Sequence, residues 1–301
     1  MLKKKIILLF VMIFFITGCG STFSYENKTY YEKILCLPEN AETIEVYEEN
    51  EIDISNLPEC DNFEILEDGY EGVWSSLFVR PLAWLLINIG NKIGGYGLSI
   101  IIVTLLLRLL VMPITAKTAQ QSENMKNAKP ELEQLEKKYK DKADKEEMMQ
   151  KAQEQMMIYK KHNIKPLAGC LFAFIQIPFF LAFFQAINRV PVLFEENFLG
   201  IFQLGKTPLE AISNGQIHYL IFIVLIILTT HYSFKLNQSG TQVGDQEKQM
   251  QKMMKFMIVF ISIISFNLST GIGLYWIFNS IFTILQNLFF KIKRERKYVW
   301  N

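Results

Sequence analysis

Apolar residues gather into long runs along this chain, and charged residues gather between the runs. Three runs that are almost free of charge occupy residues 98–115, 166–187 and 217–234. A helix formed by such a run is long enough to cross the ~30 Å hydrocarbon layer of a lipid bilayer. We therefore interpret each run as a transmembrane helix.

A fourth apolar run is too long for a single crossing. It extends from Phe256 to Phe290, and one helix of that length would measure about 52 Å. Gly271 and Gly273 interrupt the run, so we expect two short helices, 253–270 and 271–290, joined by a tight glycine turn. The pattern thus predicts an all-α membrane protein with five transmembrane helices, of which the last two should thin the bilayer around them.

The first residues have the order of a bacterial lipoprotein signal. Three lysines precede an apolar run, Ile6–Ile16, that is too short to span comfortably, and Gly18 then precedes Cys19. This order predicts that residues 1–18 are removed as a signal peptide and that Cys19 is lipidated, for example with palmitate. An uncleaved anchor helix with a chance cysteine is the alternative.

The following segment, 19–72, is acidic, and we expect it to be extracellular. Residues 20–72 hold fifteen Asp or Glu but only two Lys. This composition predicts a small or partly disordered tether with one candidate strand at Thr43–Tyr47. Cys36 and Cys60 could form a disulfide on that side of the membrane, but two cysteines alone leave their pairing open.

Residues 73–97 predict an interfacial amphipathic helix on the outer face. Trp74 and Trp84 alternate here with polar residues such as Asn88, and aromatic side chains beside polar ones favour the headgroup level. Pro81 suits the first turn of such a helix. Three glycines between positions 94 and 97 should end it before the first crossing.

Positive charge distinguishes the two sides of the membrane. By count, twelve Lys lie in 116–165, four in 235–255, and five Lys or Arg in 291–297, whereas 188–216 holds only Arg189 and Lys206. The positive-inside rule then places 116–165, the loop 235–252 and the basic tail 291–301 in the cytoplasm, and 188–216 outside. We expect a multi-pass protein of the plasma membrane with its N-terminus outside and its C-terminus in the cytoplasm.

The cytoplasmic segment 116–165 has the pattern of a helical hairpin. Pro130 suits the start of a helix that carries an apolar stripe of Leu132, Leu135 and Tyr139. The second helix carries Met149, Ala152, Met156 and Tyr159 on one face. We expect the two stripes to pack against each other in an antiparallel pair.

Arg108 lies ten residues into the first predicted crossing, near the middle of the membrane. A charged side chain there costs about 2.5–3.5 kcal/mol on insertion scales. The five predicted crossings contain no Asp or Glu that could pair with it. We therefore expect Arg108 to face a hydrated cavity inside the helix bundle. The alternative is an arginine satisfied by backbone carbonyls and by amides such as that of Gln176.

Other polar residues of the crossings could line the same cavity. They are Thr104, Gln176, Thr230, Ser233, Asn279 and Gln286. Thr104 lies one turn before Arg108, and Asn279 and Gln286 are seven residues apart on one helix face. Each residue alone is more often a contact between helices than a functional group. Together with Arg108 they indicate a polar groove.

The chemistry outside this groove is sparse. Methionines gather in the hairpin and between residues 250 and 257, where they could meet varied hydrophobic partners or simply fill gaps. The basic tail could contact ribosomal RNA or anionic lipid, or it could only set the topology. No nucleophile motif, phosphate-binding loop or metal-ligand spacing occurs, so we expect neither enzyme activity nor a cofactor or metal.

Several segments taken together resemble the YidC insertase family. The likeness is found in Pro81–Thr115 with its arginine, Lys129-Pro-Glu-Leu, Ile175-Gln-Ile-Pro178, Gly273-Leu-Tyr-Trp-Ile-Phe-Asn279 and Gln286. It extends over roughly residues 74–290 and adds Trp276 to the predicted groove. The lipoprotein signal and the short tail are similar to the Gram-positive type of this family.

The resemblance implies a membrane protein insertase that inserts and helps fold integral membrane proteins through a groove open to the cytoplasm. Its partners would be nascent membrane proteins, membrane lipid and, through the basic tail, the ribosome. Whether it acts alone or with the Sec translocon stays open. The rival interpretation is a small-solute transporter or channel, although proton-coupled transporters usually carry carboxylates within the membrane. A structural, lipid-binding lipoprotein is a third interpretation.

Overall fold

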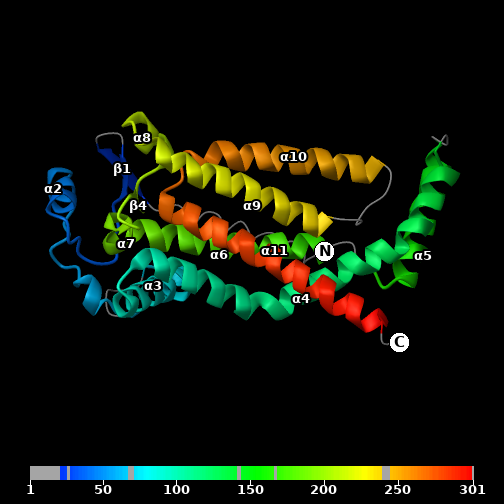
Figure 1. The fold of residues 1–301 in the computed structure, drawn as a ribbon, viewed down its shortest axis with the longest axis horizontal. Helices are drawn as coiled ribbons and strands as arrows, with labels where there is room; N and C mark the ends of the chain where they lie inside the picture. Colours follow the sequence, from blue (N-terminus) through cyan, green and yellow to red (C-terminus); the bar gives the residue numbers. More distant parts are fainter. Residues whose placement is uncertain are drawn as a thin grey trace. The chain divides into compact units, whose positions relative to one another are not determined.

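Helices make up most of the computed structural model, which describes residues 21–25, 28–66, 71–140, 144–165, 168–238 and 245–299 (Figure 1). Cys19 and the predicted signal peptide lie outside these residues. The chain divides into two compact units. The first consists of Met1–Leu106, Gln176–Val224 and Ile264–Phe278, and the second of Leu107–Ile175, Leu225–Ile263 and Asn279–Asn301.

Five long helices correspond to the apolar runs. They are α4 (Tyr96–Lys138), α6 (Ala168–Arg189), α9 (Leu220–Gln238), α10 (Asp245–Ser265) and α11 (Thr270–Val299). Within the described residues, three segments are long and apolar enough to cross a membrane: Tyr96–Lys117, Ile217–Leu236 and Thr270–Phe290. These overlap the first, third and fifth predicted crossings. The second and fourth coincide with α6 and α10 and remain predictions.

In the first unit, residues 21–66 form a folded N-terminal lobe rather than a partly disordered tether. A hairpin of β1 (Thr22–Tyr25) and β2 (Lys28–Tyr31) precedes α2 (Ala41–Glu49). The predicted strand at Thr43–Tyr47 is wrong, because these residues lie within α2. The Asn40 side chain caps this helix by accepting from the Glu42 N–H at 2.9 Å, and the residues that looked like a strand bury one helix face.

The lobe has its own core and a covalent link. Tyr47 lies fully buried against Ile34 and Ile54. Cys36 and Cys60, the two cysteines whose pairing the sequence left open, form a disulfide with a Cα–Cα distance of 4.8 Å. A hydrophobic centre and a crosslink thus compensate for the small size of the lobe.

Replacing Cys36 and Cys60 by serine together is expected to destabilise the lobe by about 3 kcal/mol. The disulfide closes a loop with a sequence separation of 24 residues and so restricts the unfolded chain. Hydrogen exchange of residues 28–66 in the full-length protein measures this loss. Cys170→Ser is the control and should leave the exchange unchanged; equal protection in the double variant would contradict the prediction.

The lobe leads into a short helical pair that matches the predicted interfacial segment in position. A π-helical turn, η2 (Ser75–Val79), continues directly into α3 (Arg80–Ile93), with Pro81 in its first turn. Gly94 ends α3 in the left-handed conformation with φ 73°, which an L side chain would disfavour. Leu77 and Trp84 remain exposed on one side.

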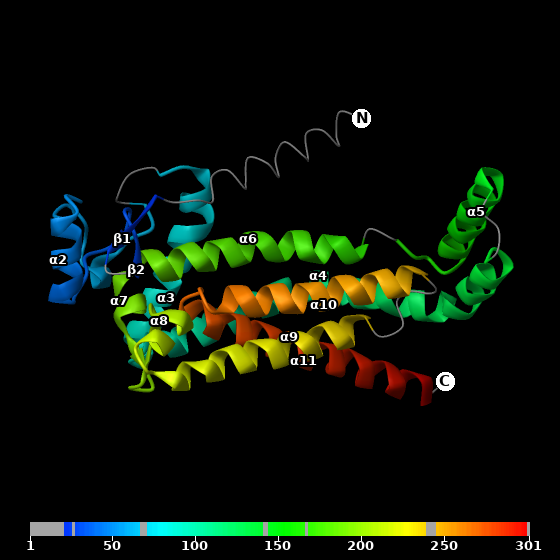
Figure 2. The ribbon, with the colours of Figure 1, turned by 90° about the horizontal axis from the view of Figure 1, so that it is seen from above.

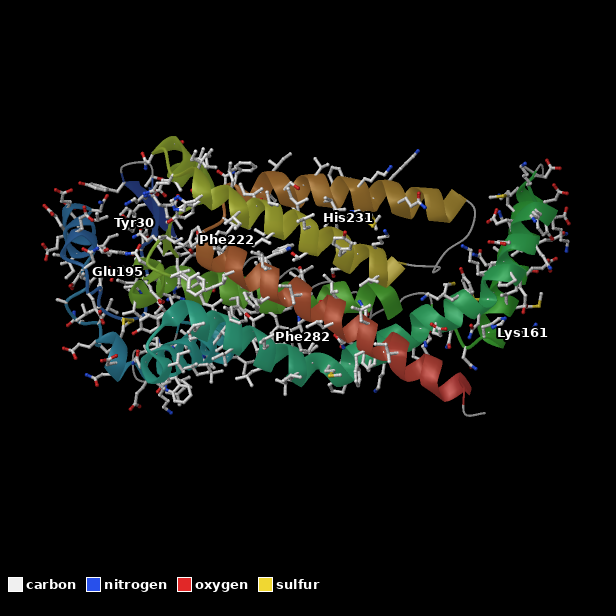
Figure 3. All side chains as sticks on the ribbon, in the orientation of Figure 1. Tyr30, Lys161, Glu195, Phe222, His231 and Phe282 are labelled. Carbon is white, nitrogen blue, oxygen red and sulfur yellow. A yellow bond between two sulfur atoms is a disulfide. The ribbon has the colours of Figure 1, made fainter. Side chains whose placement is uncertain are left out.

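The segment between α6 and α9 is a compact set of small elements. It contains α7 (Pro191–Glu195), β3 (Asn197–Phe198), β4 (Phe202–Gln203), α8 (Pro208–Ser213) and η3 (Ile217–Tyr219). Phe202 packs edge-on against Phe222 of α9, which is labelled in Figure 3, with ring centroids 4.9 Å apart. These contacts all belong to the first unit.

The break between α10 and α11 does not lie where the sequence predicted it. The two helices exist, but the turn covers residues 266–269, and Gly271 and Gly273 belong to the start of α11. The turn is held by the preceding segment, because the N–H groups of Thr270 and Gly271 donate to the carbonyls of Lys206 (3.0 Å) and Leu204 (2.8 Å). A Cβ on Gly271 would lie 3.0 Å from Ile187, so close packing is what this glycine provides.

In the second unit, α4 continues without interruption through two prolines. The prediction that a new helix starts at Pro130 is wrong, since Pro113 and Pro130 both lie inside α4. Each proline removes one backbone hydrogen bond. Ala128 and Leu132, on either side of Pro130, are buried against Ile164, and this packing favours a continuous helix there.

The antiparallel partner of this part of α4 is α5 (Lys145–Lys161), which lies beside it in Figure 2. Three ion pairs join the two helices: Lys138–Glu154 at 2.6 Å, Lys151–Glu136 at 2.8 Å and Lys161–Glu131 at 2.9 Å. As predicted, Leu132, Leu135 and Tyr139 are buried, and Tyr159 contacts the core around Leu132. The rest of the predicted α5 stripe is wrong, because Met149, Ala152 and Met156 are exposed and charged residues make the contacts instead.

Candidate functional site

Arg108 is buried within the second unit. Its side chain is only 7% exposed, and its Nε donates a hydrogen bond to the Oδ1 of Asn279 on α11. The predicted crossings contain no carboxylate that could pair with Arg108. One partner of its guanidinium is instead the neutral side-chain amide of Asn279. An amide orients the guanidinium but leaves its positive charge in place.

A second polar contact repeats the first one two turns further along both helices. The Gln286 Nε2 donates to the Thr115 Oγ1, and both side chains are less than 9% exposed. Thr115 in turn donates to the Met112 carbonyl at 3.0 Å. We call these two contacts, Arg108–Asn279 and Thr115–Gln286, the polar rungs.

The spacing of the rungs fixes the direction of the helices. Arg108 and Thr115 are seven residues apart, as are Asn279 and Gln286, so both contacts join residues separated by 171 positions. A constant separation means that α4 and α11 run parallel here, with one face of each helix turned to the other. Thr283 lies on this face of α11 and is satisfied by the Asn279 carbonyl at 2.9 Å.

Two predicted groove residues come from α9 of the same unit. Thr230 and Ser233 are 3% and 8% exposed and lie one turn apart, so they share a buried face. The residues between them, His231 and Tyr232, are exposed; His231 is labelled in Figure 3. The inward face of α9 is therefore the polar one at this level, and the outward face is aromatic.

The remaining predicted groove residues belong to the first unit and make local contacts. The Thr104 hydroxyl donates to the carbonyl of Ile100 in its own helix at 2.6 Å. The Gln176 amide donates to the Tyr275 hydroxyl at 2.9 Å. Trp276 packs edge-on against Phe180 with ring centroids 5.4 Å apart. Each of the three has a structural role, and whether they also line a groove remains a prediction.

Thr115 is a site residue that the polar pattern of the crossings did not single out. It marks the end of the first predicted crossing, and it follows Arg108 by the same seven residues that separate Asn279 from Gln286. The matching intervals were the available signal. Tyr275 was also missed, and its contact with Gln176 could not be predicted from either residue alone.

A second buried arginine lies in the first unit, although the sequence indicates only a charge in an outer loop. Arg189 at the end of α6 donates through Nη2 to both carboxylate oxygens of Glu71, at 2.8 and 2.7 Å. Its Nη1 donates to the Ser75 hydroxyl at 3.4 Å, and its carbonyl accepts from the Leu35 N–H at 2.8 Å. Arg189 therefore fastens the N-terminal lobe to α6.

The Arg189 contact changes the pKa of the Glu71 carboxyl group. Burial alone would raise the pKa of its carboxyl group, but the hydrogen bonds and charge of Arg189, with help from Ser75 and Arg80, outweigh burial. The pKa of Glu71 is therefore lower than its ordinary value. Elsewhere among the described residues, no group of three or more His, Cys, Asp or Glu side chains is arranged to hold a metal ion.

Comparison with known proteins agrees on one family. The family model described as 60Kd inner membrane protein matches residues 88–297. The membrane protein insertase YidC of Oceanobacillus iheyensis is 35% identical over 226 residues, which cover 72% of this chain and 83% of that protein. YidC 1 of Listeria monocytogenes is 36% identical over 75% of this chain and 76% of its own length. MisCA of Bacillus subtilis, also a membrane protein insertase, is 34% identical over 72% of this chain and 79% of its own.

A solved structure of a relative is similar as well. It is a crystal structure of an active YidC insertase with the first transmembrane domain resolved, and it matches with a TM-score of 0.49 and 21% sequence identity. The match covers 73% of this chain and 48% of that one. The N-terminal lobe, which ends at residue 66, lies before the segment that the family model matches.

Proposed function

Because this chain belongs to the YidC family and is a membrane protein insertase of a bacterial membrane, we propose that it passes its substrates along a hydrated groove at the polar rungs. The observation that carries this proposal is the buried Arg108, held by Asn279 between two apolar helices. A charge is kept within a membrane protein when it faces protein or water rather than lipid. The second rung extends the polar path by two helix turns.

We further propose five crossings, with the lobe outside and the C-terminus in the cytoplasm. Since α4 and α11 run parallel, an odd number of crossings must separate them, so α6 and α10 either both cross along with α9 or neither of them crosses. The 22 residues of α6 correspond to roughly 33 Å, which is enough to cross, whereas the charge-free part of α10 begins only at Phe256 and would belong to a short fourth crossing. The lysine-rich segment 116–165 supports the cytoplasmic side for the α4–α5 pair.

The disulfide supports the opposite side for the N-terminal lobe. Disulfides persist in oxidising compartments and are rare in the cytosol. The Cys36–Cys60 bond is therefore expected outside the cell, on the same side of the membrane as the lipid anchor proposed at Cys19. An anchored N-terminus and a crosslinked lobe on the outer face are consistent with a lipoprotein of the Gram-positive type.

In this mechanism the substrate first meets the α4–α5 pair. Four methionines of α5 are more than half exposed: Met148, Met149, Met156 and Met157. Flexible, polarizable side chains adapt to apolar segments of different sequence. The polar end of the substrate then enters the groove. There Arg108 attracts a carboxylate more strongly than it would in bulk water, because the surrounding dielectric constant is lower. The apolar part of the substrate leaves into lipid, driven by hydrophobic transfer.

Replacing these four methionines by glutamine is expected to weaken capture of nascent membrane proteins by roughly tenfold. Each methionine loses about 1 kcal/mol or less of apolar contact, and only part of the set meets any one substrate. Crosslinking of ribosome-bound nascent chains to α5 measures this change. Alanine substitution of Gln150 and Gln153, two exposed polar residues of α5, is the control; an unchanged crosslinking yield in the methionine variant would argue against capture on this surface.

The groove itself is tested by cysteine crosslinking on α9. Ser233→Cys is nearly isosteric and places a thiol on the buried face, whereas Tyr232→Cys places one on the neighbouring exposed face. Both variants are made in a Cys170→Ser background and exposed to stalled nascent chains that carry one cysteine in their polar tail. We expect a disulfide crosslink to position 233 and none to position 232.

Two results would overturn this route. Tail crosslinks that form at position 232 but not at 233 would mean that the substrate slides along the lipid-facing surface. Insertion at the normal rate while the thiol at position 233 is blocked by a bulky maleimide would have the same meaning. Binding of the ribosome to the tail 291–301 and cooperation with the Sec translocon are separate proposals that these experiments leave untouched.

A further inference from the structure

The tip of the β3–β4 hairpin exposes two large apolar side chains. Three residues, Leu199, Gly200 and Ile201, connect the paired residues Phe198 and Phe202. Leu199 is 73% exposed and Ile201 is 58% exposed. The inward face of the hairpin is occupied differently, since Phe202 is buried against the ring of Phe222. The outward side of the tip is therefore apolar, and none of the described residues covers it.

The backbone at the tip disfavours leucine. Leu199 has φ 55° and Gly200 has φ 73°, and the Ile201 N–H donates to the Phe198 carbonyl at 3.3 Å. A turn with positive φ at both central positions prefers Asn-Gly or Asp-Gly, because a leucine strains the left-handed conformation. A polar residue would serve this turn better in water. The turn geometry therefore does not account for a leucine at position 199. An apolar environment around its side chain would account for it.

The exposed tip is continuous with the outward face of a candidate membrane crossing. The His218 ring nitrogen donates to the Ile201 carbonyl at 3.2 Å, which joins the hairpin to the start of the segment Ile217–Leu236. On that segment Ile217, Ile221 and Val224 are each more than half exposed and lie on one helix face. An outward apolar face on a crossing helix meets lipid.

The hairpin is also fixed in position relative to this face. Its Leu204 carbonyl accepts from the Gly271 N–H at 2.8 Å, and the Gly205 N–H donates to the Phe194 carbonyl at 2.9 Å. A Cβ on Gly205 would clash with the same carbonyl, so the approach is too close for any larger residue. The segment that follows β4 is thus fixed to α7 and to the start of α11, which sets the position of the hairpin base.

From these observations we propose that Leu199 and Ile201 insert into the lipid leaflet at the N-terminal end of α9. The hairpin then acts as a lipid anchor, and the turn between α10 and α11, which is bonded to it, is held at a set depth. The occupant is lipid because the tip prolongs a lipid-facing surface of the same unit. The proposal does not depend on the insertion route, since it concerns only where the tip resides.

Depth-dependent quenching tests the anchor on the full-length protein. An NBD fluorophore is attached to Leu199→Cys in a Cys170→Ser background and reconstituted sparsely into liposomes of phosphatidylethanolamine and phosphatidylglycerol. Lipids with a nitroxide near the headgroup end of the acyl chain are the quencher. Val224→Cys is the lipid reference, and Glu45→Cys on α2 of the lobe is the aqueous reference. We expect quenching at position 199 at least about fivefold above that at position 45, as for an apolar tip buried in the acyl boundary.

Quenching at position 199 equal to that at position 45, with free access for aqueous iodide, would overturn the proposal. Emission that turns blue only as the protein-to-lipid ratio rises would also overturn it, because the tip would then meet a second copy of the chain. A second measurement uses Leu199→Asn, which suits the turn. With NBD at Ile201→Cys, this variant should lose at least about half of the lipid quenching if the leucine anchors the tip.

Discussion

Replacing Arg108 by alanine is expected to slow the insertion of substrates with an acidic tail by at least about tenfold. A hydrogen bond to a charged group contributes about 1.5–3 kcal/mol, and about 1.4 kcal/mol corresponds to a factor of ten. The guanidinium is buried and positioned by Asn279, so the substrate carboxylate would lose a preorganised partner. Protease protection of a tailed substrate in reconstituted proteoliposomes measures the insertion rate.

A second variant, Arg108→Lys, separates the effect of the positive charge from the effect of the shape of the arginine side chain. Arg108→Lys keeps the charge but loses the planar donor that meets Asn279, so we expect an intermediate rate. A substrate with a neutral tail should insert into both variants at close to the normal rate. Lys117→Ala removes an exposed charge from the same helix and is the matched control, for which a change of less than about twofold is expected.

An Arg108→Ala protein that inserts acidic tails at the normal rate would contradict the proposed role of the charge. Misfolding would instead lower the rate for acidic and neutral tails alike. Hydrogen exchange of α11 near Asn279 distinguishes the two cases. A folded protein that discriminates between the tails supports charge capture.

Arg189→Ala is expected to weaken the docking of the N-terminal lobe by about 2–3 kcal/mol. Hydrogen bonds to a charged group contribute about 1.5–3 kcal/mol, and the Glu71 side chain, which is 24% exposed, is partly compensated by water when Arg189 is removed. The Arg189 side chain is 8% exposed, and it joins Glu71, Ser75 and the carbonyl of Lys33. Hydrogen exchange of residues 28–66 should accelerate by roughly thirtyfold or more, since about 1.4 kcal/mol is a factor of ten.

The control for this variant is a longer and more exposed ion pair between the lobe and α8. Lys28 lies 4.0 Å from Glu210, and its side chain is 44% exposed, so Lys28→Ala should cost about 0.5 kcal/mol or less. Because the docking contact and the disulfide stabilise the lobe differently, the disulfide should remain intact in Arg189→Ala. If exchange in the Arg189 and Lys28 variants were equal, the lobe would be docked by its apolar contacts alone.

Low pH is expected to weaken the contact between Arg189 and Glu71. The pKa of Glu71 in the folded protein is lower than in the unfolded chain, so its contribution to stability is complete above about pH 4.5 and is lost as the pH falls through the lowered value. Exchange of the lobe should therefore rise below that pH in the unmodified protein. Glu71→Gln should remove most of this pH dependence while weakening docking at neutral pH.

Local pattern was a poor guide in the lobe and around Pro130, and a better one for the three segments that are long and apolar enough to cross a membrane. Thr43 to Tyr47 alternate enough to suggest a strand, yet the cap at Asn40 and the core around Tyr47 favour a helix. Pro130 looked like a helix start, and burial of its neighbours kept α4 continuous instead. In the lobe a local cap acts together with the distant residues of the core, and at Pro130 burial against Ile164 outweighs the short-range preference.

The sequence alone determined three segments that are long and apolar enough to cross a membrane, the likeness to a known family and a lone charge within the first of these segments. These follow from hydropathy and charge, which act on each segment separately when it meets a membrane. Only the tertiary structure decided that Arg108 meets Asn279, that the turn before α11 precedes its glycines, and that Arg189 holds the lobe. Each of these depends on two segments far apart in the chain, whose approach no local pattern records.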